Sequence, residues 1–154
     1  MKKQQIPIAE GLPMIQEMVK SVVISAKIGK TSSWIHNKQN HNVIYGKQQL
    51  FTEDDIRLLN SALPEIGKQI LSSVIVYTDN RDEMSQQMRT LFAILRSYYV
   101  FCEKMGKTKS WYQNRISKKQ EGTKRASFSS SDVLAVNTIA LEIANTLLPI
   151  EFTL

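Results

Sequence analysis

The sequence predicts an all-α protein made of two tandem, pseudo-symmetric helix-turn-helix units of about four helices each. Three observations lead to this prediction: an internal repeat with a 77-residue offset, a helix-capping pattern that occurs once in each copy, and a helix–glycine–helix pattern that precedes it. No segment shows the regular alternation of apolar and polar residues that is typical of a half-buried strand.

The internal repeat aligns the two halves of the chain without a gap. Between residues 28–70 and 105–147, twelve of the 43 aligned positions are identical, and both tryptophans of the chain, Trp34 and Trp111, fall on the match. Self-similarity of this kind is the signature of a duplicated unit. We therefore predict one domain over residues 1–77 and a second over residues 78–154, joined near the polar stretch 78–82.

The last helix of each unit is predicted by its capping residues. Thr52 is a good N-cap residue with Asp55 three positions later, and Ser129 and Asp132 repeat this arrangement. Apolar residues then recur every three or four positions through both segments, which predicts a long helix with one buried stripe. We expect Pro64 to kink or split the first of these helices.

A shorter motif precedes each of these long helices. Short helices are predicted over residues 22–28 and 99–105, and each is followed by a glycine and by a third helix that starts at Thr31 or Thr108. The small residues Ser25 and Cys102 stand four positions before the glycine, where two helices cross closely. We expect Cys102 to fill a core position there, and we expect a turn or a short extended piece within residues 40–50.

Composition restricts the class of protein. The net charge is +6 and the pI about 9.5, which suits a polyanionic partner. One cysteine, no apolar stretch of membrane-spanning length and no secretory pattern in the first residues predict a cytoplasmic protein without a membrane partner. No pattern indicates catalytic residues, a cofactor, a metal site or a small-molecule substrate, so we do not expect an enzyme.

The helix–glycine–helix pattern resembles the lambda-repressor/Cro-type helix-turn-helix superfamily. The wider pattern Gly-Lys-Thr-x-Ser-Trp-x-x-Asn, followed by Phe-(Thr/Ser)-x-x-Asp, is also similar to a group of short, uncharacterised bacterial and phage-borne proteins. The resemblance implies a protein that binds double-stranded DNA, as a transcriptional regulator of mobile-element or prophage type. Lys38 and Arg115 depart from the repressor pattern, because that family usually has an apolar residue at this position.

The resemblance also implies which residues contact DNA. The early residues of the third helix would face base edges in the major groove, and the lysines and arginines around them would contact phosphates. The implied base-facing residues are Thr31, Ser32, Ser33, Asn37, Thr108, Lys109, Ser110 and Asn114. The implied phosphate-contacting residues are Lys30, Lys38, Lys47, Lys107, Arg115, Lys118, Lys119, Lys124 and Arg125.

Two alternatives to DNA binding by both units stay open. The chain could be a helical protein–protein interaction module that keeps the fold, in which case an apolar patch should cover the third helix. The basic residues could also form an ordinary solvated face. Whether one or both units bind DNA, and whether the chain forms a homo-oligomer, does not follow from the residues.

Overall fold

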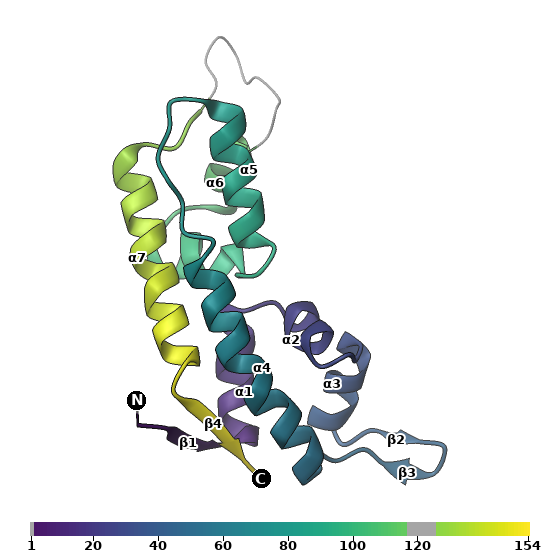
Figure 1. Ribbon diagram of the computed structural model, residues 1–154. Coiled ribbons are helices and arrows are strands. Elements are labelled where there is room, and N and C mark those ends of the chain that lie inside the picture. The colour runs from purple at the N-terminus through teal and green to yellow at the C-terminus, as the bar shows by residue number, and fades with distance from the viewer. Residues whose placement is uncertain (1, 117–125) are drawn as a thin grey trace.

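The computed structural model describes residues 2–116 and 126–154. Within these residues the chain forms eight helices and four short strands (Figure 1). In chain order they are β1 (Gln4–Pro7), α1 (Ile8–Met18), α2 (Ser21–Lys27), α3 (Ser32–Gln39), β2 (Val43–Ile44), β3 (Lys47–Gln48), α4 (Glu53–Leu71), α5 (Arg81–Phe92), the π-helix η1 (Tyr98–Lys104), α6 (Lys109–Ile116), α7 (Ser130–Leu147) and β4 (Ile150–Thr153).

The predicted starts of the two long helices are confirmed. The Thr52 hydroxyl accepts a hydrogen bond from the Asp55 amide at 3.2 Å, and the Asp55 carboxylate accepts one from the Thr52 amide at 2.9 Å. Ser129 and Asp132 form the same reciprocal pair, at 3.1 and 2.8 Å. Each pair satisfies two backbone donors that a helix N-terminus leaves free. α4 runs through Pro64 without being split.

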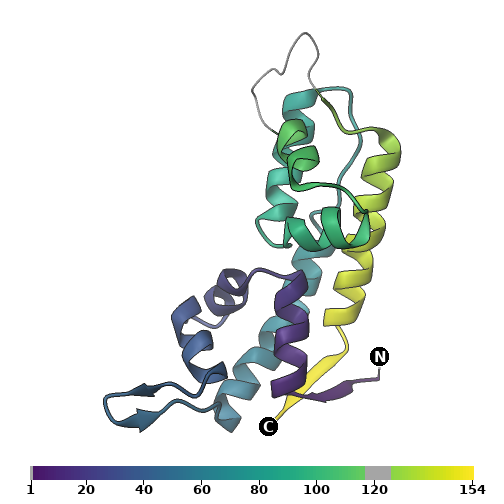
Figure 2. The ribbon, with the colours of Figure 1, turned by 180° about the vertical axis from the view of Figure 1, so that it is seen from behind.

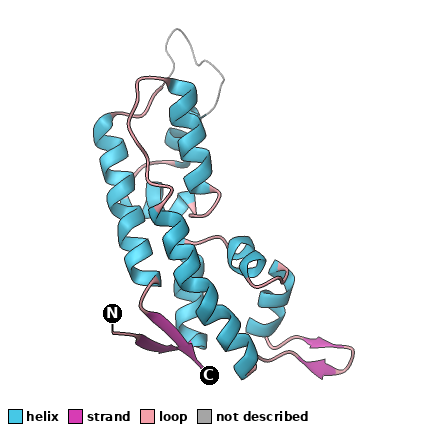
Figure 3. Ribbon diagram, in the orientation of Figure 1, coloured by secondary structure: helices cyan, strands magenta, loops and turns pink. Residues whose placement is uncertain are grey.

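The prediction of an all-α protein is wrong, because four strands form two small sheets (Figure 3). β1 pairs in parallel with β4, with Gln4 opposite Ile150, and β2 pairs with β3 in an antiparallel hairpin. The strands have only two to four residues, too few for an alternating pattern to be visible in the sequence. β1 and β4 also come from opposite ends of the chain, so their pairing depends on the tertiary fold.

The prediction of two tandem units is wrong as well, because the two halves of the chain are interlocked. α4 and α7 are staggered along the molecule and pack against each other in its middle (Figure 1). The Asn60 side chain on α4 binds the backbone N–H and C=O of Phe152 after α7, at 2.7 and 3.1 Å. The Asn137 side chain on α7 binds the backbone of Ile75 after α4, with both bonds at 2.8 Å. In each half, the segment that follows the long helix is therefore hydrogen-bonded to the long helix of the other half.

A single hydrophobic core runs through both halves. Its fully buried side chains include Leu12, Leu63 and Met88, and the largest of the fully buried ones are Phe101 and Phe152. The predicted domain boundary at residues 77 and 78 falls in the extended segment between α4 and α5 and stays a prediction. None of the helices in residues 2–116 and 126–154 has both the length and the apolar character that a bilayer span requires.

Candidate nucleic-acid interface

In the first half, the short helices α2 and α3 are joined by a turn at Gly29. The amides of Gly29 and Lys30 donate to carbonyls of α2, and Gly29 adopts a φ of +70°, a conformation that favours glycine. The Thr31 hydroxyl accepts from the Trp34 amide at 3.2 Å and caps α3. Ser25, with 1% of its surface exposed, lies at the helix crossing, as the small-residue pattern predicts.

α3 turns a polar face to solvent. Ile35 is buried and anchors the helix, whereas Ser32, Ser33 and His36 are exposed. Asn37 is half-buried, and its side-chain oxygen accepts a hydrogen bond from the Asn42 amide group at 2.9 Å. Asn37 therefore supports the segment that follows α3, while the exposed hydroxyls and the histidine are available to a partner.

A β-hairpin projects beside α3 (Figures 1 and 2). Tyr45 and Gly46 connect its strands with φ values of +50° and +76°. Two successive positive φ values define the tight hairpin turn whose twist matches that of the flanking strands. Tyr45 is fully exposed at the tip and Lys47 is exposed next to it. The sequence indicated a turn or a short extended piece here but not a paired hairpin, because Tyr-Gly is a weak hairpin signal, and Tyr45 was not among the predicted contact residues.

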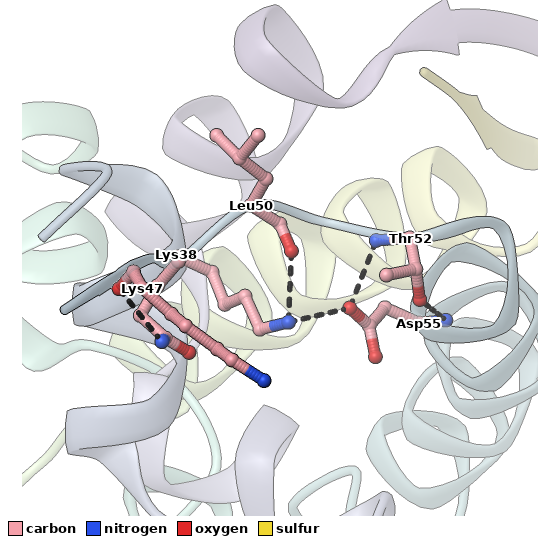
Figure 4. A network of polar contacts seen from close by, with 6 residues as sticks. Lys38, Lys47, Leu50, Thr52 and Asp55 are labelled. Atoms are coloured by element: carbon pink, nitrogen blue, oxygen red, sulfur yellow. Dashed lines mark hydrogen bonds and ion pairs between the residues drawn. The ribbon is translucent and has the colours of Figure 1, made fainter. Parts of the chain in front are cut away.

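Lys38 connects α3 to the start of α4 (Figure 4). Its ammonium lies 3.0 Å from the Asp55 carboxylate, donates to the Leu50 carbonyl at 2.8 Å, and lies 5.4 Å from the centre of the Trp34 ring. Burial raises the pKa of Asp55, but the Thr52 amide and the Lys38 ammonium together outweigh it, so that the pKa lies below its ordinary value of 3.8. The Lys38 ammonium is thus engaged in contacts within the protein, with Asp55 and the Leu50 carbonyl.

The segment that contains α2, α3 and the hairpin has basic residues but no acidic ones. Residues 18–52 contain five lysines and no aspartate or glutamate. With Lys38 paired to Asp55, the exposed lysines Lys27, Lys30 and Lys47 carry the positive charge around α3 and the hairpin. The Lys30 ammonium lies 5.6 Å from the centre of the Trp34 ring, so its charge is held near the start of α3.

The second half has a related arrangement around α6. Gly106 has a φ of +68°, and the Thr108 hydroxyl accepts from the Trp111 amide at 3.2 Å. Lys107, Thr108, Lys109 and Ser110 are all exposed. The Arg115 guanidinium lies 4.0 Å from the centre of the Trp111 ring and donates to the Trp111 carbonyl.

The remaining predicted residues of the second half are either half-buried or outside the described residues. Asn114 is half-buried, and its backbone carbonyl accepts from Arg81. Of the predicted contact residues that the structure describes in this half, those from Lys107 to Ser110 are exposed, whereas Asn114 and Arg115 are half-buried. Lys118, Lys119, Lys124 and Arg125 lie outside the described residues.

Tryptophan and phenylalanine pack together behind both third helices. Trp34 meets Phe51 edge-on at 6.0 Å between ring centres, and Trp111 meets Phe128 edge-on at 5.8 Å. In each half these rings pack the third helix against the start of the long helix, which fixes the position of the third helix. In the part of the chain that the structure describes, no group of three or more His, Cys, Asp or Glu residues is arranged to hold a metal ion.

Comparison with known proteins adds one match. Residues 8–75 match a family described as a domain of unknown function (DUF5053). The matched region extends from the start of α1 past the end of α4 and includes α2, α3 and the hairpin. No match was found among curated proteins or among solved structures.

Proposed function

We propose that the chain is a sequence-specific DNA-binding protein that uses α3 and the β2–β3 hairpin, acting as a transcriptional regulator of mobile-element or prophage type. The observation that supports this most is the helix-turn-helix with its polar, solvent-facing α3 beside an exposed hairpin, all within a segment that contains no acidic residue. An α-helix fits the major groove of B-DNA, and a protruding arm or ribbon next to it can reach the neighbouring backbone or minor groove.

Individual residues take different roles in this proposal. Ser32, Ser33 and His36 face base edges, because they are the exposed side chains of α3. Lys30, which precedes α3, and Lys47, on β3 of the hairpin, contact phosphates. Asn37 and Lys38 support the interface from within, because the side chain of each is held by residues of the loop or of α4.

The second half contributes through the start of α6. Lys107 and Lys109 are exposed and flank the N-cap residue Thr108, so they can contact phosphates of the same duplex or of a second one. A DNA target agrees with the cytoplasmic location that the sequence predicts. The alternative, a protein–protein interaction module, predicts an apolar third-helix surface, whereas the exposed residues of α3 are Ser32, Ser33 and His36.

The experiment is a salt titration of DNA affinity. Fluorescence anisotropy with a labelled random duplex gives the slope of log affinity against log salt, to which each phosphate contact contributes about −0.9. Replacing Lys30 and Lys47 by alanine should flatten this slope by up to about 1.8. The matched control replaces Arg57 and Lys68, two exposed cations on α4 that pair with acids of the same helix, and should leave the slope unchanged.

The same titration separates the alternatives. If the wild-type chain does not bind duplex DNA at low salt, DNA binding is excluded and the interaction module becomes the better account. If the Lys30 and Lys47 variant keeps the wild-type slope while the chain still binds DNA, the interface lies elsewhere and α3 with the hairpin is the wrong surface. Selection of preferred duplexes followed by Ser33→Ala and His36→Ala tests base reading at individual positions.

A further inference from the structure

A cleft of about 300 Å³ opens where the two halves of the chain meet, away from the hairpin. Its lining residues come from the start of α2, the junction of α5 with η1, and the start of α6. Its walls include the cations Lys20, Arg96 and Lys109, the tyrosines Tyr98 and Tyr112, and Cys102. The volume is at the lower end of the range for small-molecule sites.

Backbone hydrogen bonds fix the position of two of these cations. The Lys20 amide donates to the Ile94 carbonyl at 3.0 Å, and the Arg96 amide donates to the Met18 carbonyl at 2.8 Å. Val19 and Leu95 form a β-bridge between these bonds, and both are fully buried. Lys20 and Arg96 are therefore brought to one wall by a rigid crossing of the chain, although they belong to different halves.

The cleft is strongly positive. No aspartate or glutamate lines it, and in the described residues none of the three ion pairs involves Lys20, Arg96 or Lys109. Burial raises the pKa of Tyr112 to about 12, so its hydroxyl stays neutral at physiological pH and adds no negative charge. Three cations around one small cleft repel one another, and an anion bound between them removes this repulsion.

The cleft also offers aromatic surface. Tyr98, on the wide turns of η1, is 62% exposed, and Tyr112 stacks on Phe101 with 4.5 Å between ring centres. π-helical turns are rare and are frequent at functional sites. Here η1 supplies Tyr98, Phe101 and Cys102 to the same cleft. A ligand with both a flat ring and a negative group would use the tyrosines and the cations together.

We propose that this cleft binds a nucleotide, with its phosphate among Lys20, Arg96 and Lys109 and its base against the tyrosines. The proposal does not depend on duplex binding by α3 and the hairpin, because neither Lys30 nor Lys47 lines the cleft. Lys109 is shared with the proposed duplex contact at the start of α6, so the test variants change Lys20 and Arg96 instead. The nucleotide can be free or can be the end of a nucleic-acid strand, since both present the same phosphate and base. Occupation would hold η1 and α6 against the start of α2.

Cys102 provides a direct reporter for the cleft. It is the single cysteine of the chain, and it is half-buried in the cleft wall. A bound ligand should therefore slow its alkylation by a maleimide. The full-length chain is titrated with AMP, ATP, adenosine, pyrophosphate and a short single-stranded oligonucleotide, and binding of each is measured in parallel by calorimetry.

The expected result is that AMP or ATP slows alkylation at least tenfold and binds at least tenfold more tightly than adenosine or pyrophosphate. Lys20→Ala should lower the affinity at least tenfold. The variant Lys20→Ala/Arg96→Ala should abolish it, and circular dichroism checks its fold because Arg96 also donates to the Gln16 carbonyl. The matched control is Lys27→Ala/Lys104→Ala, which removes two exposed lysines of α2 and η1 that do not line the cleft, and it should bind as the wild type does.

Each other outcome has a defined meaning. Protection by the oligonucleotide alone, lost in Lys20→Ala, supports the proposal and identifies a strand end as the source of the nucleotide. Equal protection by pyrophosphate and ATP overturns the nucleotide assignment, because the tyrosines then contribute nothing. Absence of protection by every ligand at millimolar concentration, or equal binding by wild type and Lys20→Ala, overturns the site.

Discussion

Two capping boxes of the same geometry have different electrostatic surroundings. Asp55 and Asp132 each accept a hydrogen bond from the amide of their N-cap residue, but only Asp55 also has a lysine ammonium at 3.0 Å. Arg115, which aligns with Lys38 in the repeat, instead stacks on Trp111 and donates to its carbonyl. The capping role of both aspartates could be predicted from local sequence. The ion pair could not, because it depends on how α3 packs against the start of α4.

This difference predicts a specific pH dependence. The pKa of Asp55 lies below its ordinary value of 3.8, so its charged form stabilises the folded state above pH 3.8 and this stabilisation is lost as the pH falls further. Asp55→Asn should keep the capping acceptor but lose the ion pair, at a cost of about 1 kcal/mol near pH 7. The difference from wild type should shrink below pH 3.8. Urea denaturation of both proteins at pH values from 7 to below 3.8 measures this difference in the free energy of unfolding.

Asp132→Asn is the matched control for that experiment. It changes the same position of the second capping box, and its carboxylate forms none of the ion pairs found in the described residues. If Asp55→Asn and Asp132→Asn lose the same stability at pH 7 and follow the same pH curve, the Lys38 ion pair does not contribute to folding.

At the level of elements, the predictions were best where one segment determines its own structure. The N-caps Thr31, Thr52 and Ser129 all begin helices where the sequence placed them. The hairpin and the β1–β4 pair were missed because two to four residues carry almost no periodic signal. Cys102 was expected in the core but is half-buried at a cleft, because η1 is a π-helix and presents its side chains at different angles from an α-helix.

The hairpin turn predicts a functional effect that is separable from stability. Gly46 has a φ of +76° with no neighbouring atoms where a side chain would stand, so Gly46→Ala costs about 1–2 kcal/mol of local backbone strain without a steric clash. Because Tyr45 and Val43 are exposed, opening the hairpin should change the global unfolding midpoint little. Duplex affinity should fall severalfold, as measured by anisotropy, if the hairpin contacts DNA.

Gly11→Ala supplies the contrasting control. A Cβ at Gly11 would lie 2.7 Å from the Phe152 ring and 2.9 Å from Ile6, so this change should lower global stability by about 1–3 kcal/mol. Duplex affinity should be retained wherever the protein stays folded, because Gly11 is buried on α1 against Phe152 and Ile6 and is not part of α3 or the hairpin. Wild-type affinity of Gly46→Ala would show that the hairpin is not part of the interface.

At the scale of the whole molecule, the repeat predicted which segments resemble each other but not which of them pack together. The 77-residue offset aligns Asn60 with Asn137 and Ile75 with Phe152. In the structure Asn60 binds Phe152 and Asn137 binds Ile75, so each asparagine holds the segment that follows the long helix of the other half. Local patterns are the same whether such a contact forms within a half or between halves, and only the tertiary structure distinguishes the two.

The interlocked halves predict a single cooperative unfolding transition. Trp34 and Trp111 lie in different halves, so Trp34→Phe and Trp111→Phe each leave one fluorescent reporter for one half. The two denaturation curves should coincide.

Asn137→Ala leaves the backbone N–H and C=O of Ile75 without their partner and should shift both curves equally, by about 1–3 kcal/mol. Asn145→Ala, an exposed asparagine on the same helix, should cost less than about 0.5 kcal/mol. A shift confined to the Trp111 curve would mean that the halves unfold independently and that the exchanged asparagine contacts do not couple them.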